Sequence, residues 1–146
     1  MQTLLFLHNL IRWCILIAGI YAITKAALGY FKKRAFTAAD NKSQLFFVLF
    51  CHTQLLIGLI LYFISPAVDE AFRSGKMMTD AAYRFVAVEH IATMIIAIAF
   101  IQAGRIVSKK ATEDAAKHRK ALIFFSIGML LILSRIPWHK PLIPGM

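Results

Sequence analysis

The segment LFFVLFCHTQLLIGLILYFI, residues 45–64, decides the fold because it holds no formal charge over 20 residues. At about 1.5 Å of rise per residue, a helix of this length matches a bilayer hydrocarbon core of roughly 30 Å. Ser65-Pro66 follows at once, and proline disfavours helix at the residue before it. The segment is therefore predicted to be a transmembrane helix that ends at Ile64.

Three further apolar segments lie on either side of it, at about residues 4–31, 83–106 and 121–138. The whole chain of 146 residues is 60% apolar and only 16% charged, whereas soluble domains carry about 25% charged residues. The sequence therefore predicts one all-α domain, residues 1–146, that forms an integral membrane four-helix bundle in contact with the lipid bilayer. Thr37 and Thr112 precede two of the helices as candidate caps.

The connectors predict the orientation. The net charge of +10 is concentrated in the first and third connectors, whereas the middle connector is balanced. Basic connectors stay on the cytoplasmic side, so both termini are predicted to lie outside a bacterial inner membrane that the chain crosses several times. Because the charge is explained in this way and no basic-aromatic nucleic-acid motif is present, we expect no nucleic-acid partner.

Among the ionisable side chains within the predicted spans, six are candidates for a functional site, because such groups are costly in a membrane unless they have a partner or a function. They are His8, Arg12, His52, Glu89, His90 and Arg135. All except His52 are expected in the outer half of the bundle, and His52 near the middle of the membrane. His8 and Arg12, four residues apart, lie on one helix face. His118 and His139 are expected to be solvated at the two membrane surfaces.

These residues support a haem b hypothesis, because two imidazoles from different helices can ligate one haem iron inside a helix bundle. His8 and His90 are the favoured ligands, and His52 is the substitute. Arg12 or Arg135 would pair with a haem propionate. Glu89 would orient a histidine through its second ring nitrogen. The predicted role is one-electron transfer with a quinone or another redox subunit.

Two alternatives use the same polar cluster. In the first, Glu89 pairs with Arg12 or Arg135, and the chain is a non-catalytic membrane subunit or accessory protein whose polar groups hold helices or partners together. In the second, histidine and glutamate exchange protons with a bound quinone. A homo-oligomer is compatible with every reading.

The sequence lacks a covalent haem motif, a glycine-rich phosphate loop and a nucleophile with its base. It therefore indicates an electron-transfer or accessory subunit rather than a self-contained enzyme.

The chain resembles a group of small bacterial four-span membrane proteins labelled cytochrome b-like. The segments that carry the resemblance are LHNLIRW (7–13), FTAAD (36–40), RFVAVEH (84–90), DAAKHRK (114–120) and RIPW (135–138). The resemblance implies a four-helix membrane fold, bound haem and electron transfer. Membrane cytochromes with two bis-histidine haems need four ligands within the spans, and this chain offers three histidines there. One bis-histidine haem is therefore the most that fits.

Overall fold

The computed structural model describes residues 1–140, and this part of the chain is helical with short connections. The elements in chain order are α1 (Gln2–Phe31), α2 (Ala38–Ile64), α3 (Pro66–Arg73), α4 (Ala81–Arg84), the π-helical turn η1 (Phe85–Glu89), α5 (His90–Lys110) and α6 (Asp114–Ser134).

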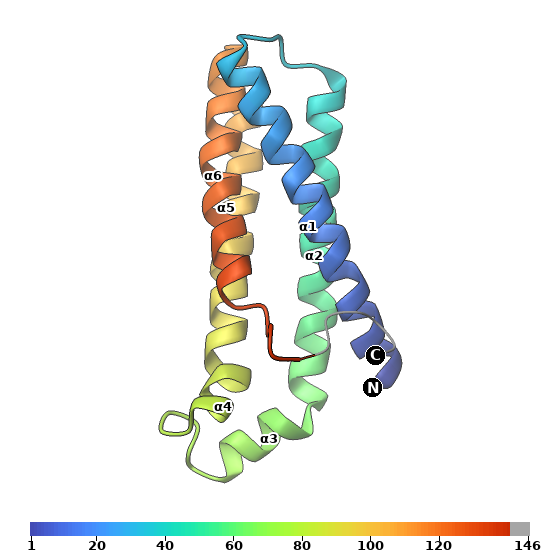
Figure 1. The fold of residues 1–146 in the computed structure, drawn as a ribbon, viewed down its shortest axis with the longest axis vertical. Coiled ribbons are helices and arrows are strands. Elements are labelled where there is room, and N and C mark those ends of the chain that lie inside the picture. The colour runs from blue at the N-terminus through green and yellow to red at the C-terminus, as the bar shows by residue number, and fades with distance from the viewer. Residues whose placement is uncertain (141–146) are drawn as a thin grey trace.

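The four long helices pack side by side. α1 lies against α2 and α6, and α5 lies against the same two helices (Figure 1). The α1–α2 and α5–α6 connections lie at one end, and the short helix α3 lies at the other (Figure 1). We call these the basic end and the α3 end. The basic end carries the lysine-rich and arginine-rich connectors, as the sequence predicted.

Three helical stretches within residues 1–140 are long and apolar enough to cross a membrane. They are α1, α2 and the continuous stretch Ala81–Lys110. Large apolar side chains on the outer surface, such as Ile17, Phe63 and Leu130, are exposed, as lipid contact requires. α6 is not among the candidate spans, because Lys117, Arg119 and Lys120 lie in its first half and leave only residues 121–134 of the helix uncharged. Membrane contact is thus supported, and a fourth span stays a prediction.

Several helix boundaries differ from the prediction. α2 begins seven residues before Leu45, because Thr37 and Asp40 form a reciprocal capping box. Thr112, by contrast, is not a cap, since α6 begins after Glu113 without a side-chain cap. α6 ends at Ser134 and not at Trp138, because Pro137 interrupts the helix. The helix α3, whose N-terminus Ser65 caps, was not predicted.

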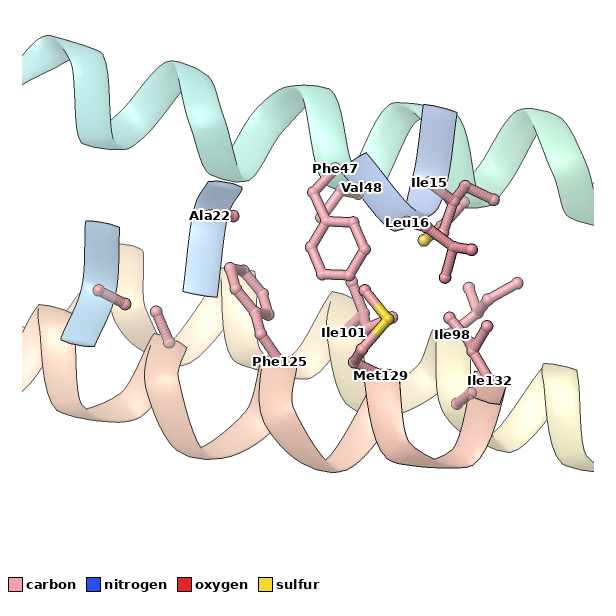
Figure 2. Close-up of a cluster of buried hydrophobic side chains, with 14 of the residues drawn as sticks. Ile15, Leu16, Ala22, Phe47, Val48, Ile98, Ile101, Phe125, Met129 and Ile132 are labelled. Atoms are coloured by element: carbon pink, nitrogen blue, oxygen red, sulfur yellow. The ribbon is translucent and has the colours of Figure 1, made fainter. Parts of the chain in front are cut away.

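The apolar core lies between the four long helices (Figure 2). Its centre is Phe47 of α2 and Phe125 of α6, both with no exposed surface. Their rings meet edge to face, with centroids 5.3 Å apart and planes at 89°. This geometry is the favourable one for an aromatic pair. Helix packing in lipid depends on such close contacts, because lipid tails are as apolar as the side chains themselves.

His118 lies in the packed interior at the basic end, and the prediction that it is solvated was wrong. Only 1% of its surface is exposed. Its Nε2–H donates to the main-chain oxygen of Arg34 at 3.2 Å, and its ring lies 5.3 Å from that of Phe36. Gly29 leaves the room for this ring, since a Cβ there would collide with it.

Candidate functional site

A cavity of about 700 Å³ lies toward the α3 end and is lined by residues of α1, α2, α3, η1, α5, α6 and the segment after α6. Its volume is within the range of small-molecule sites, roughly 300–1,000 Å³. Its wall is mainly apolar and includes Ile15, Leu55, Met94 and Ile98. Pockets with an apolar wall and a few polar groups are typical ligand sites.

The rings of His8 of α1 and His90 of α5 lie next to each other in the lining of this cavity. Their ring centroids are 6.3 Å apart, with the ring planes at 65°, and both residues are half-buried. A transition metal binds an imidazole nitrogen at roughly 2 Å, so a metal between two opposed imidazoles separates their centroids by roughly 6 Å. The centroid separation of this pair is close to that value, and the two rings meet edge to face.

The main chain after α6 holds the His90 ring in place. Nδ1 of His90 lies 2.8 Å from the carbonyl oxygen of Arg135, and because a carbonyl oxygen only accepts, Nδ1 is the donor. In the neutral ring, Nε2 then has a free lone pair, which is the tautomer that a metal-binding histidine needs. The ring of Phe85, five residues earlier, lies 5.8 Å away on the π-helical turn.

His8 is positioned by α2. The amide Nε2 of Gln54 donates to the main-chain oxygen of His8 at 2.8 Å. Gly58, one helical turn further along α2, makes space for the ring, since a Cβ at Gly58 would lie 3.3 Å from Cε1 of His8. A larger residue at position 58 would therefore push the ring of His8 aside.

Three buried side-chain polar atoms within residues 1–140 have no hydrogen-bond partner. They are Nδ1 of His8, Oε1 of Gln54 and Nε of Arg135. His8 and Gln54 line the cavity, and Arg135 directly precedes Ile136, which also lines it. Buried polar groups in native proteins nearly always have partners, so the two unpartnered atoms in the cavity lining, on His8 and Gln54, indicate a polar ligand or bound water there.

The charged side chains that line the cavity are basic. Arg12, which is only 8% exposed, lies in its lining, and Nη1 of Arg12 donates to Oδ1 of Asn9 at 3.3 Å. Lys140 lines it as well. No aspartate or glutamate from the described part of the chain contributes to the lining. The cavity therefore suits an amphipathic ligand with an acidic group.

Glu89 is placed differently from the prediction. Its carboxylate pairs with Arg84 at 3.3 Å, and neither Arg12 nor Arg135 is its partner. In a π-helix, residues five apart lie above each other, so the turn Phe85–Glu89 brings Arg84 and Glu89 together. The ring of His90 is oriented by its hydrogen bond to the main-chain oxygen of Arg135 and not by Glu89.

His52 lies outside the cavity. It is exposed on the outer surface of α2, where its Nε2 lies 2.6 Å from Oε1 of Gln102 on α5. It therefore cannot replace His8 or His90 as a ligand in this arrangement. His139 is exposed as predicted, with its ring 5.9 Å from that of Phe85.

The sequence reasoning missed Gln54 and Gly58 as site residues. Their spacing was an available signal, because residues four apart share a helix face and Gln54 is an amide within an uncharged span. Tyr62, four residues further on, follows the same face. Its hydroxyl donates to the main-chain oxygen of Ala87 at 2.7 Å and so satisfies a carbonyl group of the π-helical turn.

No group of three or more His, Cys, Asp or Glu side chains in residues 1–140 is arranged to hold a metal ion. Comparisons with protein-family models, curated proteins and solved structures gave no match. The fold and the cavity define a helical protein with membrane-spanning character and a cavity that two adjacent histidines line. The resemblance to cytochrome b-like proteins remains a prediction.

Proposed function

We propose that this chain is a b-type cytochrome-like membrane protein that binds one haem b near the outer face through His8 and His90. The observation that supports this most strongly is the adjacent histidine pair, with ring centroids 6.3 Å apart in the lining of a cavity of about 700 Å³. Bound haem b would supply a reversible one-electron couple at its iron. The role is electron transfer with a quinone or another redox subunit.

The side chains around the cavity suit this group in three ways. The Arg135 carbonyl accepts from the ring of His90, the Gln54 amide donates to the main chain of His8, and these two bonds hold the histidines in place. Arg12 and Lys140 provide cations for two carboxylates. The mainly apolar wall favours a flat hydrophobic ring system.

The proposed topology has four membrane spans, with α6 as the fourth and both termini outside a bacterial inner membrane. The support is the charge distribution, since the two basic connectors lie at one end of the helices (Figure 1). α6 also packs against α1 and α5, which both belong to stretches long and apolar enough to cross a membrane. With this orientation, the cavity opens toward the outer side.

An absorption spectrum tests the haem proposal. The protein, expressed with sufficient haem and purified in mild detergent, should show a Soret band and the sharp reduced-state bands of a bis-imidazole haem. His8→Ala and His90→Ala should each lose the band or convert it to a five-coordinate spectrum, and added imidazole should restore it. His52→Ala should retain the parent spectrum, because His52 lies outside the cavity.

Two results would contradict the proposal. One is a colourless protein that is folded by circular dichroism and gel filtration. The other is a band that survives in both His8→Ala and His90→Ala. A colourless protein that co-purifies with redox subunits would support the accessory-subunit alternative.

A further inference from the structure

A polar pair lies on the lipid-facing surface, away from the cavity. His52 of α2 and Gln102 of α5 are 2.6 Å apart between Nε2 and Oε1. His52 is seven residues beyond Leu45, the start of the uncharged segment, and so lies roughly 10 Å inside it at 1.5 Å per residue. Polar side chains at this depth rarely face lipid, because the hydrocarbon offers them no hydrogen bonds.

The hydrogen bond between them leaves two groups without a partner in the described part of the chain. Oε1 of Gln102 accepts from Nε2–H of His52, so Nδ1 of His52 retains an acceptor lone pair. The amide NH₂ of Gln102 retains donors. One copy of the pair thus presents an acceptor and a donor side by side, with no net charge in the neutral state.

The two polar residues interrupt two apolar stripes with the spacing of a helix–helix interface. On α2, the exposed residues recur every three or four positions, at Leu45, Leu49, His52, Leu56, Ile60 and Phe63. On α5, the spacing alternates between three and four, at the exposed residues Ala92, Ile95, Ala99 and Ile106 and at the partly buried Gln102. We call these residues the α2–α5 stripe. Alternating spacing of this kind, with one polar position, is the pattern by which helices associate in a defined register.

We propose that the α2–α5 stripe is the interface with a second copy of this chain. Two copies with the same membrane orientation are related by a twofold axis along the membrane normal, so equal residues meet at equal depth. Across such an axis, the amide NH₂ of one Gln102 reaches Nδ1 of the other copy's His52, and the reciprocal bond forms as well. The donor and the acceptor of the His52–Gln102 pair in one copy thus match the acceptor and the donor of the same pair in the other copy, and a partner of opposite charge is not needed. This inference is independent of the haem proposal.

Disulfide cross-linking in native membranes tests the interface. Leu56→Cys places a thiol on the stripe, and Leu130→Cys places one on the exposed surface of α6; the two leucines are 62% and 68% exposed. Both changes are made with Cys14→Ser, while Cys51 stays because it is buried. Copper-catalysed oxidation should give a dimer of twice the chain mass from Leu56→Cys, and at least tenfold less from Leu130→Cys.

The second arm removes the polar pair. His52→Leu with Gln102→Leu, added to Leu56→Cys, should lower the dimerisation constant in lipid by roughly threefold per lost hydrogen bond, and so by roughly tenfold for two. Circular dichroism and gel filtration report whether the helices and the monomer are intact.

Three results would overturn the proposal. They are equal cross-linking at positions 56 and 130, a dimer fraction unchanged by the double leucine variant, and a cross-linked product whose mass includes a different protein.

Discussion

Replacing Gly58 with leucine should block the proposed ligand site from the α2 side. A Cβ at position 58 would lie 3.3 Å from Cε1 of His8, which is tighter than an ordinary contact. The rest of a leucine side chain would extend into the cavity that Gly58 lines. Adding carbon atoms to a packed site costs about 1–3 kcal/mol, because neighbouring side chains must leave their preferred positions. This corresponds to a loss of haem affinity of about 5-fold to 150-fold.

The assay is a titration of the haem-free protein with haem in detergent, followed by the Soret absorbance. Gly58→Ala should have a smaller effect, because a single methyl group requires His8 to move by only a few tenths of an ångström. Thr53→Leu is the matched control, since it enlarges an exposed residue on the same helix. If Gly58→Leu binds haem as tightly as the parent chain and Thr53→Leu, the placement of His8 beside the ligand is wrong.

Two further predictions concern the basic end. Thr37→Ala should lower the free energy of unfolding by about 0.5–2 kcal/mol, because it removes the cap of α2. Thr112→Ala should change this free energy little, because Thr112 caps no helix. Unfolding in a denaturing detergent measures both variants, and equal effects would contradict the capping assignment. Gly29→Val should cost about 1–3 kcal/mol by displacing the buried ring of His118, whereas Leu28→Val on the exposed side should not. The same unfolding assay tests this, and an unchanged stability of Gly29→Val would refute the packing described for His118.

Helix positions were largely predictable, because hydropathy over 20 residues reports directly on the solvent around a helix. The end of α1 at Phe31 and the end of α2 at Ile64 are as predicted. The approach of His8 to His90 also followed from depth alone, since both lie near the same end of their helices. Lys117, Arg119 and Lys120 show the limit of this reasoning, because they leave the span status of α6 open.

Side-chain direction was less predictable, because it depends on rotation about the helix axis. The π-helical turn at Phe85–Glu89 changes that rotation, and it turned Glu89 toward Arg84. His52 faces outward and His118 faces inward, although the sequence suggested the reverse for each. In a uniformly apolar segment, the hydropathy does not vary with the helical period. The sequence around a histidine there does not show whether the side chain faces the bundle or the lipid.

The placement of the histidines on α1 and α5 has a consequence for biogenesis. These two helices are diagonal neighbours, each packed against α2 and α6, so a ligand held by both histidines would connect opposite corners of the structure. A ligand that binds only the folded state stabilises it by about 2.7 kcal/mol at a hundred times its dissociation constant. Cellular supply of the ligand would then set how much of the newly inserted chain escapes degradation by membrane proteases.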